Sequence, residues 1–163
     1  MESIYSIAPF DWTAIGTTLL CGFMIGLERQ LRGKPVGIRT STLITLGTYV
    51  YVVLAASVSN NATDPSRAIG QVITGVGFLG AGVMLARDGV VVGVTSAASI
   101  WALASVGVCI GTGNHLTAIK LSAVIIAVLI GVEASENYFK SLTRGVHKKY
   151  SAWWKKDDCT PDL

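Results

Sequence analysis

Charged residues are scarce in this sequence. Only 14% of its 163 residues are Asp, Glu, Lys or Arg, whereas soluble domains carry about 25%. Half of the residues (51%) are hydrophobic. A soluble chain of this length needs a charged shell, and the long uncharged stretches exclude one. The composition therefore predicts an integral membrane protein.

Cysteine and histidine are too few and too far apart for a disulfide framework or a common metal site. Cys21, Cys109 and Cys159 form no C-x-x-C motif, and His115 and His147 are expected on opposite sides of the membrane. Mg²⁺ is normally held by one or two carboxylates with retained waters, and nothing in the sequence specifies such a site. We expect no cofactor and no enzymatic activity, and we assign no metal ligand.

Five apolar segments approach the ~20 residues that a helix needs to cross ~30 Å of hydrocarbon. We expect helices at about residues 10–28, 41–58, 68–86, 95–111 and 116–135. They predict an all-α membrane bundle over residues 1–136. Residues 137–163 would form a basic cytoplasmic tail, whose apolar residues recur at the spacing of an amphipathic interfacial helix.

The basic residues predict the orientation of the bundle. Eleven of the thirteen Lys and Arg residues fall on one side of the five predicted helices, mainly in the loop after the first helix and in the tail. Because basic loops remain in the cytoplasm, the N-terminus is predicted outside and the C-terminus inside. The first eleven residues contain no Lys or Arg, so we expect no cleavable signal peptide. Membrane topology accounts for the positive charge, and we expect no nucleic-acid partner.

Residues 75–82 read GVGFLGAG, which matches the G-x-G-x-x-G fingerprint of dinucleotide-binding folds. That fold also needs an acidic residue at the end of a second strand, about 20 positions on. The candidate strand, residues 90–94, is followed by Thr95 and Ser96 instead. Four further apolar segments surround this one. We therefore interpret the match as a coincidence of spacing.

Small residues on helices give a better account of the glycines. Gly70, Thr74, Gly77 and Ala81 follow one another at helical spacing and predict a face that another helix approaches closely. The first helix carries the same signal in Gly22 and Gly26, and the fourth carries it in Thr95, Ala98 and Ala102. We expect these three helices to form a tightly packed centre. The alternative is that the glycines break the third helix beside a polar cavity.

Two polar segments flank the predicted helices. The loop from Glu28 to Thr40 is dense in charge and turn residues, which is typical of a topology determinant that also contacts anionic lipid. Asp64 and Pro65 open the third helix and are predicted as its N-cap and first residue.

Three segments together resemble the MgtC/SapB family of bacterial inner-membrane proteins. They are GLERQLRGKPVGIRT (26–40), DPSRAIGQVITGVGFLGAG (64–82) and GVTSAASIWALASVGVCIGTG (93–113), and they occur in the family's order. The resemblance implies a multi-pass protein of the bacterial inner membrane.

The resemblance also assigns candidate functional residues. In the cytoplasmic loop these are Glu28, Arg29, Gln30, Arg32, Gly33, Lys34, Pro35, Gly37, Arg39 and Thr40. In the third helix they are Asp64, Pro65, Arg67, Gln71, Gly75, Gly77, Gly80 and Gly82, and Thr95 and Trp101 follow from the third segment.

Members of this family are tied to growth under magnesium limitation and to survival inside host cells. The best-known members restrain the ATP synthase and affect membrane potential. The resemblance therefore implies a non-enzymatic regulator in magnesium limitation or acid stress, which acts through membrane helix contacts. The small-residue faces of the helices predict a homodimer. The alternative is a transporter or channel for Mg²⁺ or another small solute. Many members continue into a C-terminal domain similar to the ACT fold, whereas this sequence ends at Leu163, as in the short members.

Overall fold

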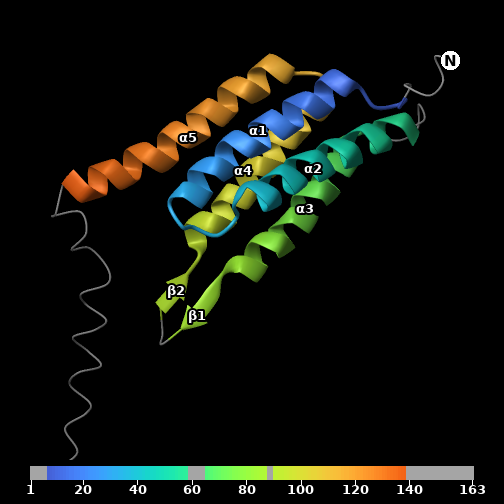
Figure 1. Cartoon of the computed structure of the whole chain (residues 1–163). Coiled ribbons are helices and arrows are strands. Elements are labelled where there is room, and N and C mark those ends of the chain that lie inside the picture. The colour runs from blue at the N-terminus through green and yellow to red at the C-terminus, as the bar shows by residue number, and fades with distance from the viewer. Residues whose placement is uncertain (1–6, 59–64, 88–89, 139–163) are drawn as a thin grey trace, which may run out of the picture. The chain divides into compact units, whose positions relative to one another are not determined.

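The computed structural model describes residues 7–58, 65–87 and 90–138 and contains five helices in that part of the chain (Figure 1). They are α1 (Trp12–Leu31), α2 (Ile38–Val58), α3 (Pro65–Val83), α4 (Val94–Gly111) and α5 (His115–Tyr138). Their ends differ from the predicted ranges by at most three residues. The all-α prediction is confirmed. Asp64 and the predicted amphipathic segment after residue 138 lie outside the described residues.

Three of the described helices have the length and the composition of membrane spans. They are α2, α4 and residues His115–Val132 of α5. α3 contributes a shorter apolar stretch, Ile69–Val83. α1 is long enough, but it holds Glu28 and Arg29 within its last two turns. The five-crossing topology and its orientation remain predictions from the sequence.

The chain forms two compact units, Met1–Ile126 and Ala127–Leu163. The first unit contains α1 to α4 and the beginning of α5. Within it α2 packs against α1, α3 and α4, and α3 also packs against α4 (Figure 1). In the second unit the described residues, 127–138, continue α5.

The closest helix contacts in the first unit all involve α2. A Cβ atom at Gly22 would lie 2.6 Å from the Cα of Thr42, and one at Gly26 would lie 2.6 Å from the Cα of Ile38. From α4, a Cβ atom at Gly107 would lie 2.6 Å from the carbonyl oxygen of Thr45. Because real Cβ atoms do not approach other atoms so closely, α1 and α4 need glycine where they meet α2.

This arrangement corrects two predictions about packing. The first, third and fourth helices do not form the tight centre, because the small residues of α1 contact α2. The small face of α3 is open, since a Cβ atom at Gly70 or Gly77 would have no other heavy atom within 4 Å. On α4, Thr95 and Ala98 are exposed, and Trp101 is 56% exposed.

Several hydroxyl groups in the packed unit donate to carbonyls of their own helices. The hydroxyl of Thr18 donates to the carbonyl of Ile15, and that of Thr45 donates to the carbonyl of Ser41. Both side chains are fully buried. This pattern lets small polar residues fill close helix contacts without leaving an unpaired hydroxyl in an apolar environment.

The start of α1 is held by a polar cap. Asp11 is the N-cap and accepts hydrogen bonds from the backbone and the hydroxyl of Thr13. The hydrogen bond from the Thr13 side chain is the main cause that lowers the pKa of Asp11 below its usual value. The carboxyl is thus ionised at neutral pH, which suits the positive end of the helix dipole.

A short hairpin joins α3 to α4 where a loop was predicted. Strands β1 (Leu85–Arg87) and β2 (Val90–Val92) pair antiparallel, with Ala86 opposite Val91. The third helix ends at Val83 and not at residue 86 as predicted. Gly93 follows the hairpin with φ +90°, against the carbonyl of Val83, and its left-handed conformation ends the strand so that α4 can begin.

We predict opposite effects for alanine at two glycines of α1. Gly22→Ala places a methyl group against the backbone of α2 and should lower the free energy of unfolding by about 1–3 kcal/mol, as overpacking does. At Gly16 a Cβ atom meets nothing within 4 Å, so Gly16→Ala should leave stability unchanged or raise it by up to about 1 kcal/mol. Thermal unfolding in detergent measures both. Equal effects at the two positions would contradict the packing described here.

Candidate functional site

Two oppositely charged side chains are buried at the end of α1. Arg29 is 4% exposed and Glu28 is 8% exposed. Burial of ionised groups is costly unless each one is paired or hydrogen-bonded. Their partners therefore define the candidate site.

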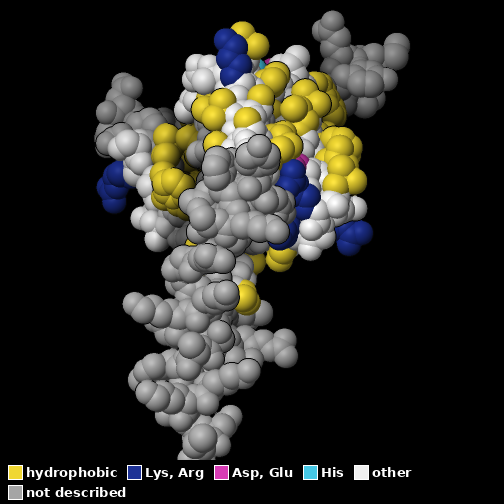
Figure 2. Space-filling model, turned by 90° about the vertical axis from the view of Figure 1, so that its left-hand side faces the viewer, with side chains coloured by type: hydrophobic (Ala, Val, Ile, Leu, Met, Phe, Trp, Pro, Cys, Tyr) yellow, Lys and Arg dark blue, Asp and Glu magenta, His cyan; other side chains and the backbone are white. Residues whose placement is uncertain are grey.

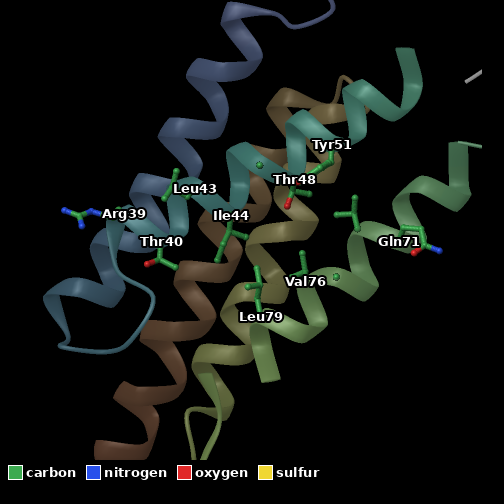
Figure 3. Close-up of a pocket in the computed structure, with 12 residues that line it drawn as sticks. Arg39, Thr40, Leu43, Ile44, Thr48, Tyr51, Gln71, Val76 and Leu79 are labelled. Atoms are coloured by element: carbon green, nitrogen blue, oxygen red, sulfur yellow. The ribbon is translucent and has the colours of Figure 1, made fainter. Parts of the chain in front are cut away.

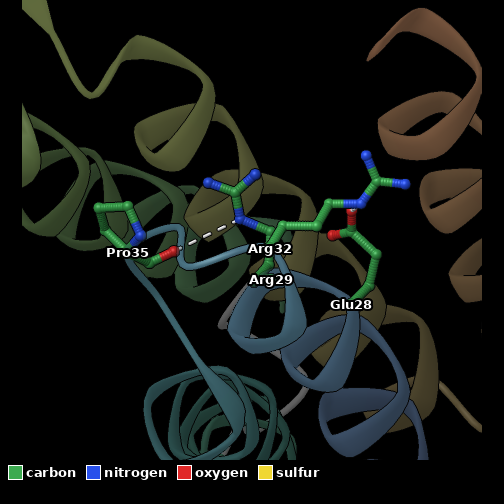
Figure 4. Close-up of polar contacts among 4 residues, drawn as sticks. All are labelled: Glu28, Arg29, Arg32 and Pro35. Carbon is green, nitrogen blue, oxygen red and sulfur yellow. Dashed lines mark hydrogen bonds and ion pairs between the residues drawn. The ribbon is translucent and has the colours of Figure 1, made fainter. Parts of the chain in front are cut away.

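Arg29 links three segments of the chain. Its guanidinium donates a hydrogen bond of 2.7 Å from one terminal nitrogen to the hydroxyl of Ser96, at the start of α4. Its Nε donates to the carbonyl of Pro35 at 3.4 Å, in the turn between α1 and α2 (Figure 4). One buried cation thus holds α1, the turn and α4 together.

Glu28 is paired with Arg32 one turn later. Arg32 Nε lies 2.7 Å from Glu28 Oε1 (Figure 4). The contact is an ion pair and not an aligned hydrogen bond, because neither Glu28 oxygen has a hydrogen bond of good geometry within the described residues. On the face shown in Figure 2, Lys and Arg side chains lie among hydrophobic ones, and acidic groups are barely visible. The guanidinium of Arg32 balances the buried charge of Glu28.

The turn between α1 and α2 is held in an unusual backbone conformation. Gly33 has φ +63° and Val36 has φ +68°. A β-branched residue in this region is strained, by roughly 1–3 kcal/mol. Two contacts hold Val36 in this conformation. Its side chain is buried, and its carbonyl accepts a hydrogen bond of 3.0 Å from the Ser41 hydroxyl. The side chain of Gln30 accepts from the backbone of Ile38 at 3.3 Å and fixes the start of α2.

A cavity of about 640 Å³ lies between α2 and α3 (Figure 3). α2 contributes Arg39, Thr40, Leu43, Ile44, Gly47, Thr48 and Tyr51 to its lining, and α3 contributes Gln71, Val72, Gly75, Val76 and Leu79. The middle of the cavity is apolar, and its polar residues lie toward the two ends. Arg39 is its one charged lining residue among those described.

The structure brings part of each predicted motif together at this cavity. Arg39 and Thr40 from the loop motif line it with Gln71 and Gly75 from the third helix. Glu28 and Arg29 belong instead to the buried cluster.

The remaining predicted residues are dispersed. Lys34, Pro35 and Arg67 are exposed, and Gly37 is half-buried against the side chain of Gln30. Pro65 is the first residue of α3. Among the α3 glycines, Gly80 packs against Ala97, whereas Gly77 and Gly82 face open space. α3 is a continuous helix, so the alternative of a helix broken at its glycines is wrong.

Several residues of the site were not identified from the sequence. Ser96 is the α4 partner of Arg29, Ser41 holds the strained Val36, and Thr48 lines the cavity. A hydroxyl residue within a membrane helix is too common to be recognised by itself. The contact of Ser96 also depends on the pairing of α1 with α4, which no local pattern indicates.

In the described part of the chain, no three His, Cys, Asp or Glu side chains are grouped closely enough to hold a metal ion. The lining of the α2–α3 cavity includes no carboxylate. The arrangement is therefore suited to contacts with apolar or anionic groups.

Comparison with known proteins agrees with this architecture. The model of the MgtC family matches residues 15–138. The chain belongs to the MgtC family. A protein of Escherichia coli (strain K12) named putative magnesium transporter YhiD is 36% identical over 96% of this chain and 79% of its own length. Protein MgtC of Brucella abortus (strain 2308) is 38% identical over 74% of this chain, and protein MgtC of Salmonella typhimurium is 35% identical over 80%.

The chain spans 51% of the Brucella MgtC protein and 55% of the Salmonella one. No solved structure matches it. The chain is therefore a membrane protein of the MgtC family. The functions of the longer relatives belong to those relatives.

We predict that Arg29 and Ser96 are energetically coupled. A double-mutant cycle of Arg29→Gln and Ser96→Ala should give a coupling of about 1.5–3 kcal/mol, the range for hydrogen bonds to charged groups. Ser99→Ala serves as the control, because the Ser99 hydroxyl donates to the Thr95 carbonyl of its own helix. Unfolding in detergent provides the free energies. Equal coupling of Arg29 to Ser96 and to Ser99 would rule out the specific contact.

Proposed function

We propose that this MgtC-family protein is a non-enzymatic regulator of the bacterial inner membrane, which acts by helix contact through the outer face of α3. The observation that carries the proposal is the set of α3 glycines that no intramolecular contact requires. Gly70 and Gly77 lie seven residues apart and therefore on one face of the helix, here called the outer face, and each has open space where a side chain would stand. They also lie in a regular helix.

Glycine in a helix has an energetic cost. Relative to alanine each one destabilises the helix by roughly 0.8–1 kcal/mol. At Gly22 and Gly26 the contact with α2 explains this cost, whereas at Gly70 and Gly77 the packed unit supplies no such reason. In a membrane, a helix face made of small residues favours the close approach of a second helix. A partner helix on the outer face of α3 accounts for these residues.

The partner in this proposal is a membrane protein. A second copy of the chain would form the homodimer expected from the sequence. The family resemblance adds another membrane complex, such as the ATP synthase, as a target during magnesium limitation or acid stress. Either partner would bind in the same way, through apolar contact between a helix of its own and the small residues of α3.

Transport of Mg²⁺ is the second candidate function, and the name of the Escherichia coli relative favours it. Mg²⁺ sites in proteins use carboxylates and retained waters. The cavity between α2 and α3 presents Arg39 and no carboxylate among its lining residues. This lining supports the regulator over the transporter.

We predict that Gly77→Leu abolishes partner contact and leaves the fold intact. A Cβ atom there has no other heavy atom within 4 Å, and the larger leucine side chain fills the space that a close helix needs. Cross-linking through a cysteine introduced near the face, in native membranes, measures the contact. Gly16→Leu is the control, since Gly16 is equally open but lies on α1. Equal cross-linking yields for both variants and the unaltered chain would overturn the proposal.

Flux measurements separate the two functions. Purified protein in proteoliposomes with a Mg²⁺-sensitive dye inside is expected to give no uptake above empty vesicles. Mg²⁺ uptake that is lost on Glu28→Gln but kept on Lys34→Gln would establish transport and contradict the regulator.

A further inference from the structure

The cavity between α2 and α3 is a groove kept open by a glycine on each wall. Gly47 lines it from α2 and Gly75 lines it from α3. Neither has any heavy atom within 4 Å of where a Cβ would stand. No packing contact in the described chain explains glycine at these two positions, and the width of the groove depends on both.

The dimensions of the groove limit what can occupy it. From Arg39 to Tyr51 the lining runs along thirteen residues of α2, whose twelve rises of 1.5 Å give a length of about 18 Å. This length is close to one leaflet's share, about 15 Å, of the hydrocarbon core. An extended acyl chain of that length fits along the groove, whose middle is lined by apolar side chains.

The chemistry of the lining changes along the groove. Leu43, Ile44, Val76 and Leu79 surround its middle, and Arg39 and Thr40 stand at one end. Figure 3 shows the guanidinium of Arg39 turned outward, away from the apolar interior. In the described part of the chain Arg39 forms no ion pair. An unpaired guanidinium beside an apolar groove matches an acyl chain inside and an anionic phosphate outside.

We propose that this groove binds a phospholipid with an anionic head group. One acyl chain lies between α2 and α3 against Gly47 and Gly75, and the lipid phosphate pairs with Arg39. Basic pockets between membrane helices on the cytoplasmic side are known to select anionic lipids, and the charge distribution predicts that side for Arg39. The site is separate from the outer face of α3, so it does not depend on the regulatory function.

The test uses the full chain in vesicles that contain equal amounts of phosphatidylglycerol and phosphatidylcholine. Native mass spectrometry after gentle extraction counts the lipids retained on each protein. The unaltered chain should retain phosphatidylglycerol in preference. Arg39→Gln should reduce that preference about fivefold, the effect of one basic residue near an anionic surface. Lys34→Gln removes an exposed charge outside the groove and should leave the preference unchanged.

A second pair of variants tests the groove itself. Gly47→Leu should abolish retention of both lipids, whereas Gly16→Leu should retain them, and circular dichroism verifies that both variants fold. Unchanged retention in Gly47→Leu would overturn the proposal. A change in oligomeric state in place of lipid loss would also overturn it, because a second copy would then occupy the groove. Gly77→Leu should keep the bound lipid, which separates failure here from failure of the proposed regulatory contact.

Discussion

The close approach of α2 to the glycines of α1 and α4 is the contact on which the rest of the packed unit depends. Gly26 of α1 lies against Ile38, the first residue of α2. Two helices that meet so near their connected ends leave room for only a tight turn between them. The positive φ of Val36 follows from that geometry, since the turn must reverse direction within six residues, 32 to 37.

The same packing makes the buried charges tolerable. Arg29 loses its hydration when α4 lies beside α1, and the Ser96 hydroxyl and the Pro35 carbonyl replace part of it. Removal of one partner from a buried charge is far more costly than removal of an exposed one. The loop motif is thus partly structural: Glu28, Arg29 and Gln30 fix the turn, and Arg39 and Thr40 are left to line the groove. Residues that lie close together in this motif therefore have two different roles.

The helices were predictable from composition, because about twenty apolar residues in a row have few other stable forms in lipid. The packing partners were not. A pair such as Gly22 and Gly26 marks a face that approaches another helix. The small residues of the third and fourth helices indicated those two as the neighbours, whereas the closest approach of this face is to α2. The pairing of residues 85–87 with 90–92 was also missed, since residues 85 and 86 were assigned to the end of the third helix and residues 90–94 were considered as a strand only for the rejected dinucleotide-binding fold. Of the candidate site, the residue types in the loop were informative, whereas the partners Ser96 and Ser41 depend on tertiary pairing.

The glycine-rich segment of α3 resolves into several roles because successive helix residues point about 100° apart. Gly75 forms the groove wall, Gly80 packs against Ala97, and Gly77 faces outward. Only Val76 and Gly80 are buried among the α3 residues whose side chains the structure describes. A lipid in the groove and a partner on the outer face would therefore meet different residues of the same helix. A side chain added at Gly77 would block the partner and leave the groove wall at Gly75 unchanged.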